Sequence, residues 1–226
     1  MNGYFITGTD TNVGKTYVTC ALARRARRHG QKVFAFKPIE SGCVQGADGT
    51  YVGADQALLV EAAGSWQHGK LRGLYQLPLP AAPLVAAEAA GTTIDLDLVV
   101  ETARAGALQG RADLTLVEGA GGWRVPITAT TDMSSLALAM SLPVLIVARA
   151  GLGTINHTLL SIEAVERDGL VLAGVVFSRR VEDDLGVARR NRDEVLRRWS
   201  GPLVVLSDDP LVLDPLLGAA NVPRGT

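Results

Sequence analysis

This 226-residue sequence has few lysines, cysteines and histidines, and its formal net charge is close to zero. The formal net charge of −1 argues against a nucleic-acid-binding protein, because such a protein needs a basic face to displace counterions from phosphates. Only Cys20 and Cys43 occur, in no metal-ligand spacing, which favours a reducing, cytoplasmic setting without disulfides. The three histidines are scattered and do not have the spacing of a zinc site.

Long apolar runs are also missing. The longest charge-free apolar run near the middle, residues 133–148, is short and contains Pro143, whereas a membrane span needs about 20 apolar residues. No basic segment precedes an apolar one at the N-terminus, so the sequence predicts neither a secretion signal nor a membrane partner. Apolar residues still make up 47% of the chain, which excludes disorder. We expect residues 1–226 to form a single globular domain.

Short runs of branched apolar residues alternate along the chain with helical patterns. The runs show no polar alternation, so each predicts a strand that is covered on both faces. The predicted strands are Tyr4–Thr7, Val33–Phe36, Leu114–Val117, Val144–Val147, Val175–Phe177 and Leu203–Leu206. The predicted helices include Gly14–Arg28, Leu136–Met140, Thr158–Glu166 and Leu185–Trp199, and Pro78–Gly91 predicts an irregular turn that leads into a helix. This alternation predicts an α/β fold with a doubly wound, mostly parallel sheet and helices on both faces.

The strongest motif lies between the first predicted strand and the first predicted helix. It reads Gly8-Thr9-Asp10-Thr11-Asn12-Val13-Gly14-Lys15-Thr16. Backbone N–H groups of such a loop converge on phosphate oxygens. Lys15 is expected to reach the β- and γ-phosphates, and the Thr16 hydroxyl to bind Mg²⁺. The motif therefore predicts a nucleoside triphosphate ligand, but it does not specify the reaction.

Two further strand ends carry charged residues. After the second strand, Pro38 and Gly42 predict a tight turn that holds Lys37 and Ser41 near the phosphates. A lysine there can neutralise charge on a transferred phosphoryl group, and Lys37 is one of only four lysines in the chain. Glu118 ends the third strand, where a carboxylate commonly binds Mg²⁺ beside a phosphate loop, and the glycines that follow are expected to leave room for a ligand.

Each of these side chains also has a structural alternative. Lys37 could be a surface lysine, Glu118 could cap a turn, and Asp55 could be the N-cap of the apolar helical stretch that follows it. Trp123 could line a pocket or a dimer contact. Asp48, in Gly-Ala-Asp-Gly, is typical of a plain turn.

Four segments together resemble the dethiobiotin synthetase family of the biotin pathway. They are residues 8–16, residues 37–42, residues 117–123 with Pro126, and residues 153–157, and they cover about the first 160 residues. The resemblance implies a ligase that closes a cyclic urea on 7,8-diaminononanoate with CO₂, ATP and Mg²⁺. One amine would trap CO₂ as a carbamate, the carbamate would attack the γ-phosphate, and the second amine would close the ring on the resulting carbamic-phosphoric anhydride.

The resemblance also implies a role for individual residues. Lys15 and Lys37 would be catalytic. The remaining roles fall into three groups: Mg²⁺ would be held by Thr16, Asp55 and Glu118; the nucleotide by Asn12, Val13, Gly14, Lys15, Thr16, Tyr17, Asp55, Glu118, Gly119, Ala120, Gly121 and Ser178; and the substrates by Thr11, Ser41, Gly153, Thr154 and Asn156. The last three would receive the substrate carboxylate from a partner chain, because the family works as a homodimer with the site at the interface.

Two segments depart from the family's pattern. Ser178 stands where the family usually has an Asn that reads the adenine edge, and Leu206-Ser207-Asp208-Asp209-Pro210 replaces a Gly-x-Ile-Pro segment. A hydroxyl cannot form the paired hydrogen bonds of an amide, so we expect weak discrimination between nucleotide bases.

Other functions share a related phosphate loop. Switch ATPases of the partition or septum-placement kind carry an extra lysine near the start of the loop, where this chain has Asp10. Amide ligases acting on a corrin ring, and the nonenzymatic domain fused to an acetyltransferase, lack the combination of Lys37 and Ser41. A module that only holds nucleotide would not need Lys37 and Glu118 beside the loop.

Overall fold

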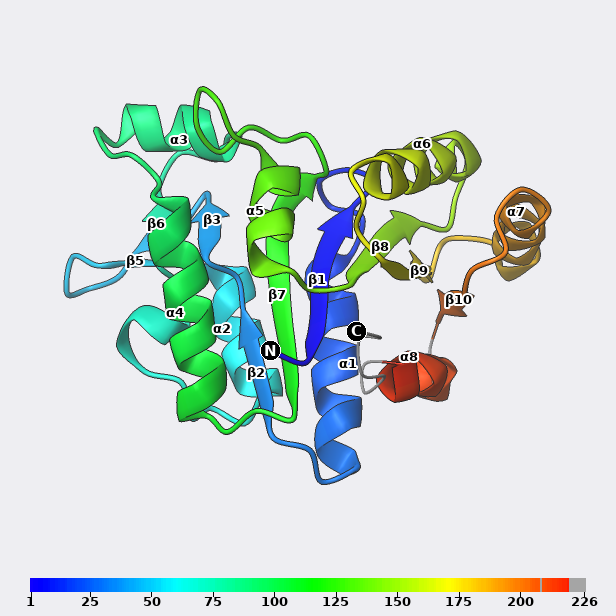
Figure 1. The fold of residues 1–226 in the computed structure, drawn as a ribbon, viewed down its shortest axis with the longest axis horizontal. Coiled ribbons are helices and arrows are strands. Elements are labelled where there is room, and N and C mark those ends of the chain that lie inside the picture. The colour runs from blue at the N-terminus through cyan, green and yellow to red at the C-terminus, as the bar shows by residue number, and fades with distance from the viewer. Residues whose placement is uncertain (208, 220–226) are drawn as a thin grey trace.

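Six parallel strands form the central sheet of the computed structural model, which describes residues 1–207 and 209–219 (Figure 1). The strand order is β10-β9-β8-β1-β7-β2. The strands are β1 (Gly3–Gly8), β2 (Val33–Phe36), β7 (Leu114–Gly122), β8 (Val144–Arg149), β9 (Leu172–Ser178) and β10 (Leu203–Leu206). The chain adds β2 and β7 on one side of β1 and then crosses to the other side for β8. The carboxyl end of β1 is therefore the switch point at which such sheets bind ligands.

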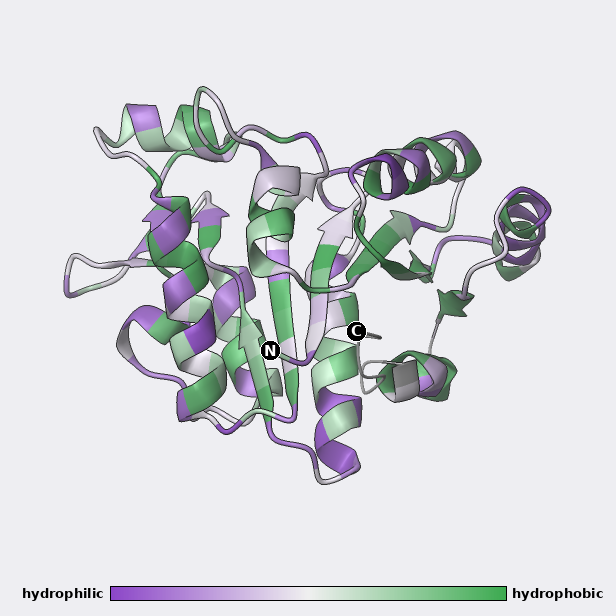
Figure 2. Ribbon diagram, in the orientation of Figure 1, coloured by the Kyte–Doolittle hydropathy of each residue, from purple (hydrophilic) through white to green (hydrophobic). Residues whose placement is uncertain are grey.

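Two hydrophobic cores cover the two faces of the sheet. Successive strand residues point to opposite faces, so Phe5 packs in one core whereas Tyr4 and Ile6 pack in the other. The Phe5 side is covered by α3 (Pro83–Ala89), α4 (Leu96–Gln109), α5 (Met133–Met140), α6 (Thr154–Arg167) and α7 (Leu185–Leu196). The other side is covered by α1 (Lys15–Arg28), α2 (Ala54–Ala62) and α8 (Asp214–Ala219). Figure 2 shows β2, β8, β9 and β10 as mainly hydrophobic and β1 and β7 as hydrophobic over part of their length, as expected for a doubly covered sheet.

The predicted strands and the doubly wound fold are confirmed, with differences at the ends of some elements. β7 continues to Gly122, so Glu118 lies within the strand and not at its tip. α6 begins at Thr154, four residues before the expected start, because Gly153 adopts a left-handed conformation with φ 90° and starts the helix. α7 ends at Leu196, before Trp199. α4 was not predicted from the sequence. It begins after Asp95, a typical N-cap residue, whose side chain accepts a hydrogen bond from the Leu98 N–H.

The prediction of a tight turn after Lys37 is wrong. Residues 39–41 form a short strand, β3 (Ile39–Ser41), which pairs in parallel with β6 (Tyr75–Leu77). The chain bends before this strand at Pro38 and after it at Gly42, where φ is 76°. The other two-stranded sheet joins β4 (Val44–Gln45) and β5 (Tyr51–Val52), and 3-10 turns occupy Gly69–Arg72 and Pro210–Leu213. Within the part of the chain that the structure describes, no helix has both the length and the apolar character needed to cross a membrane.

Candidate functional site

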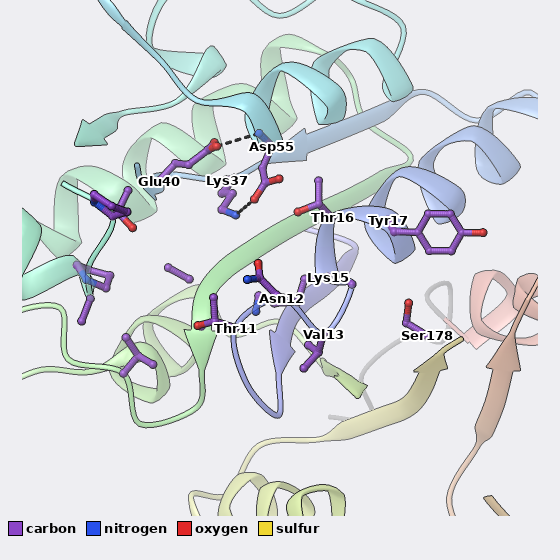
Figure 3. Close-up of a pocket in the computed structure, with 18 of the residues that line it drawn as sticks. Thr11, Asn12, Val13, Lys15, Thr16, Tyr17, Lys37, Glu40, Asp55 and Ser178 are labelled. Atoms are coloured by element: carbon purple, nitrogen blue, oxygen red, sulfur yellow. Dashed lines mark hydrogen bonds and ion pairs between the residues drawn. The ribbon is translucent and has the colours of Figure 1, made fainter. Parts of the chain in front are cut away.

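A cavity of about 1100 Å³ opens at the carboxyl ends of β1, β2 and β9 (Figure 3). The phosphate loop forms its floor. Its lining residues come from segments far apart in the sequence: Thr11 to Tyr17, Lys37, Glu40, Ser41, Asp55, Pro80 to Pro83, Ala120, Gly121, Val125 and Ser178 to Val181. The fold thus places the predicted phosphate loop and the charged strand ends around one space.

Contacts within the chain fix the conformation of the phosphate loop. Gly14 starts α1 with φ 97°, and a Cβ atom there would lie 2.3 Å from the Ser178 Oγ, so glycine is required. Lys15 Nζ donates to the Asp10 carbonyl at 3.0 Å within the same loop. Burial lowers the pKa of Lys15 to about 8. Lys15 is the first residue of α1, so its ammonium lies near the helix N-terminus. An anion bound there would replace the Asp10 carbonyl as the partner of this ammonium.

Lys37 joins the ends of three elements in one ionic cluster. Its Nζ contacts the Asp55 carboxylate and lies 3.2 Å from the Glu118 Oε1. Burial alone would lower the pKa of Lys37, but the charges of Glu118 and Asp55 outweigh it and raise that pKa. Glu118 is completely buried and also accepts hydrogen bonds from Thr16 (2.8 Å) and Thr19 (2.8 Å). The cluster thus couples β2, α2 and β7 to the start of α1.

The oxygen atoms of this cluster suit a magnesium ion. Thr16, Asp55 and Glu118 offer one hydroxyl and two carboxylates, which are the hard ligands that Mg²⁺ prefers. In residues 1–207 and 209–219, no group of three or more His, Cys, Asp or Glu side chains forms a metal site. Phosphate oxygens and water would therefore complete the coordination, as is usual for Mg²⁺.

Most of the other predicted site residues line the same cavity. These are Thr11, Asn12, Val13, Tyr17, Ser41, Ala120, Gly121 and Ser178. Gly119 does not. A Cβ atom there would lie 3.2 Å from both Met133 and Phe5, so this glycine permits close core packing and does not make room for a ligand.

The segment expected to bind a substrate carboxylate lies outside the cavity of its own chain. Thr154 is buried, and its hydroxyl pairs with that of Thr158 at 3.3 Å. Asn156 is exposed at the start of α6, next to Leu152, which is fully exposed. One chain alone therefore does not bring Gly153, Thr154 and Asn156 to the phosphate loop.

Two alternatives for individual residues are wrong. Trp123 lines neither the pocket nor an exposed surface: it is buried in the core, and its Nε1 donates to Asp168 at 2.8 Å. Asp55 is not an N-cap, because α2 begins after Gly53. Asp48 is confirmed as a turn residue, since it accepts hydrogen bonds from Thr50.

Three charged residues that line the cavity were not predicted from the sequence, namely Glu40, Arg179 and Arg180. Glu40 is buried there and accepts hydrogen bonds from the N–H groups of Asp55 (2.8 Å) and Gln56 (2.9 Å). Arg180 donates to the Asn12 carbonyl at 3.1 Å and so links the end of β9 to the phosphate loop. No signal in the sequence indicated Glu40, because the strand β3 that carries it was expected to be a tight turn. Asp208, in the segment that departs from the family's pattern, lies outside the described residues.

The chain is similar in sequence to a known family and to several named proteins. The family model described as an AAA domain matches residues 2–206. The protein named ATP-dependent dethiobiotin synthetase BioD from Anaeromyxobacter dehalogenans strain 2CP-C is 45% identical over 211 residues, which cover 93% of this chain and 92% of the relative. The protein of the same name from Anaeromyxobacter sp. strain Fw109-5 is 42% identical, covering 87% and 85%.

Structure comparisons identify the fold alone. The signal recognition particle receptor FtsY from Elizabethkingia anophelis has a TM-score of 0.58 at 14% identity, and the match covers 97% of this chain and 65% of the receptor. The MinC:MinD cell division complex of Aquifex aeolicus gives a TM-score of 0.55 at 16% identity, covering 97% and 86%. The likeness extends to the arrangement of strands and helices and not to the chemistry.

Proposed function

Because the chain belongs to the ATP-dependent dethiobiotin synthetase family, we propose that it is a ligase that forms dethiobiotin from 7,8-diaminononanoate, CO₂ and ATP. The observation that carries this proposal is that Lys15 and Lys37 line one cavity at the switch point of the sheet, while the buried Glu118 carboxylate pairs with Lys37 and accepts a hydrogen bond from Thr16. The loop lysine alone fits any nucleotide-binding protein. A second buried lysine facing the same space fits the transfer of a phosphoryl group to an anionic acceptor.

The reaction needs little covalent help from the protein. One substrate amine attacks CO₂, loses a proton to solvent and becomes a carbamate. A carbamate oxygen then attacks the γ-phosphorus while the bond to the β-phosphate oxygen breaks, and ADP leaves. Lys15 and Lys37 would hold the two anions together and in line, and would offset the charge that develops between them.

Ring closure follows on the same carbonyl carbon. The second amine attacks it and loses a proton, and the bond from that carbon to the phosphate-bearing oxygen breaks. Phosphate leaves with this oxygen, and the cyclic urea remains. Ser41 and Thr11 also line the cavity, and we assign them to orienting the diamine and its carbamate.

Thr16, Asp55 and Glu118 are the residues that would hold Mg²⁺. When bound, the ion neutralises charge on the β- and γ-phosphate oxygens. Lys37 lies between the two carboxylates, so the same residues balance charge before the nucleotide arrives.

A partner chain would complete the substrate site. The Gly153, Thr154 and Asn156 segment starts α6 and lies outside the cavity of its own chain. A helix start suits a carboxylate, and Gly153 and Asn156 are exposed there, as is Leu152. We propose that the chain forms a homodimer in which this segment receives the substrate carboxylate of the other subunit.

An assay with single omissions tests the function. ADP, phosphate and dethiobiotin should form in equal amounts when diaminononanoate, bicarbonate, ATP and Mg²⁺ are all present. Omitting the diamine or bicarbonate should abolish ADP release. ADP release that continues without the diamine would favour a switch ATPase of the partition kind and would contradict the proposal.

Weak selection of the nucleotide base is the first prediction. Ser178 is buried against Gly14 and offers a single hydroxyl where paired amide hydrogen bonds would be needed to read a base. We expect kcat/KM values for ATP, GTP and CTP that agree within about 10-fold, since one hydrogen bond contributes roughly 0.5–1.5 kcal/mol. Steady-state rates with each nucleotide measure this. A preference for ATP of several hundred-fold would contradict it.

Replacing Ser41 with alanine is expected to weaken diamine binding. Loss of one hydrogen bond to a charged group should raise the KM for diaminononanoate by about 10-fold and leave the KM for ATP nearly unchanged. The control is Ser200→Ala, at an exposed serine that does not line the cavity. If the KM for ATP rises as much as that for the diamine, Ser41 belongs to the nucleotide site.

A further inference from the structure

Helix α2 begins without a capping side chain of its own. Its N-cap residue is Gly53, which has no side chain to accept a hydrogen bond. The N–H groups of Asp55 and Gln56 occupy the second and third helical positions, which an N-cap side chain normally satisfies. The helix start therefore needs an acceptor from elsewhere in the chain.

Glu40 on β3 supplies that acceptor. Its Oε1 accepts from the Asp55 N–H at 2.8 Å, and its Oε2 accepts from the Gln56 N–H at 2.9 Å. Only 7% of Glu40 is exposed. A Cβ atom on Gly53 would lie 2.2 Å from the Glu40 Oε2, so the Glu40 carboxylate fills the space of a cap side chain and glycine is needed at position 53.

The capped residue is the one that faces Lys37. In Figure 3 the Glu40 carboxylate meets the backbone of Asp55, whose own carboxylate points to Lys37. Gln56, which follows Asp55, also holds Lys37 in place, because the Gln56 Oε1 accepts a hydrogen bond from the Lys37 N–H at 2.5 Å. Asp55 is thus fixed through its backbone and that of its neighbour, while its partly exposed carboxylate contacts the Lys37 ammonium at the cavity.

We propose that Glu40 is a positioning residue for the metal-binding carboxylates: by capping α2 from β3, it holds Asp55 at the distance from Glu118 at which both can reach one divalent cation. The inference rests on the proposed function and assigns a role to a residue outside the set predicted from the sequence. Glu40 touches no metal itself in this role, because both of its oxygens are engaged by backbone N–H groups.

The test is the variant Glu40→Gln, which keeps the size of the side chain but places an NH₂ group against one of the two N–H donors. The intact protein is saturated with a nonhydrolysable ATP analogue, and Mn²⁺ binding is followed by electron paramagnetic resonance. We expect Mn²⁺ to bind at least about 10-fold more weakly than in the wild type, as for other residues that orient metal ligands. Excess metal should restore the turnover of the variant.

Asp95→Ala is the matched control. Asp95 also caps a helix, since it is the N-cap residue of α4 and accepts a hydrogen bond from the Leu98 N–H, but it does not line the cavity. It should lower the unfolding temperature about as much as Glu40→Gln does and leave Mn²⁺ binding unchanged. Equal Mn²⁺ affinity in Glu40→Gln and the wild type would overturn the proposal, as would a raised KM for the diamine with unchanged Mn²⁺ binding, which would assign Glu40 to substrate contact.

The two proposals fail separately. If the wild type makes dethiobiotin but Glu40→Gln binds Mn²⁺ normally, only the role of Glu40 is wrong. If the wild type binds Mn²⁺ with the analogue but makes no dethiobiotin, the proposed function is wrong, and the Mn²⁺ comparison still decides the role of Glu40.

Discussion

Replacing Lys37 with alanine is expected to lower kcat by about 10³-fold and to change nucleotide affinity by less than about 10-fold. The Lys37 ammonium is balanced by the carboxylates of Asp55 and Glu118. It therefore adds little to ground-state binding, whereas the charge it offsets develops during phosphoryl transfer. Steady-state kinetics and direct binding of a fluorescent ATP analogue separate the two effects.

Lys70→Ala is the control for that experiment, because Lys70 is exposed and lies outside the cavity. The unfolding temperature of both variants should be recorded, since removing Lys37 leaves the buried Glu118 carboxylate without its ammonium partner. A loss of nucleotide affinity as large as the loss of kcat would show that Lys37 only binds ATP.

Replacing Lys15 with alanine should impair binding and turnover together. Lys15 lies at the helix N-terminus beneath the phosphate loop, where it would contact the triphosphate both before and during the reaction. We expect ATP analogue affinity to fall by about 30-fold, the equivalent of the roughly 2 kcal/mol of a hydrogen bond to a charged group. Turnover at saturating ATP should fall further, by about 10³-fold. Isothermal titration and steady-state rates measure both.

Lys32→Ala provides the comparison for Lys15, because Lys32 is exposed at the opposite end of β2 from Lys37. Unchanged analogue affinity in Lys15→Ala would mean that the loop's backbone N–H groups alone hold the triphosphate. The order of the two lysines in binding and turnover, with Lys15 acting in both and Lys37 mainly in turnover, is the signature of the proposed arrangement.

The residues that the sequence revealed share a local signal. The strand Tyr4–Thr7 and the loop from Gly8 to Thr16 are continuous in the chain, so residue type and order carry their structure. β2 then pairs in parallel with β7, with Phe36 opposite Val117, so the next residues, Lys37 and Glu118, meet for that reason. Topology is enough to place these side chains, because each follows directly from the end of a predicted strand.

The features that the sequence did not reveal depend on contacts distant along the chain. Glu40 caps a helix through the N–H of Asp55, which lies 15 residues later, and no local pattern predicts that pairing. Trp123 follows the glycines of β7 but turns into the core, where Asp168 accepts its hydrogen bond. Gly119 was expected to leave room for a ligand, but a side chain there would instead crowd Met133 and Phe5 in the core. Side-chain packing between elements, which sequence order does not encode locally, decided all three.

The transfer of one oxygen atom tests the central claim most directly. Enzyme, diaminononanoate, Mg²⁺ and ATP are mixed with ¹⁸O-labelled bicarbonate for a single turnover, and the released phosphate is analysed by mass spectrometry. If a carbamate held beside Lys37 attacks the γ-phosphorus, each phosphate carries one oxygen that came from bicarbonate. Phosphate without the label would mean that the γ-phosphoryl group passes to water or to another acceptor, and the arrangement proposed for the three strand ends would be wrong.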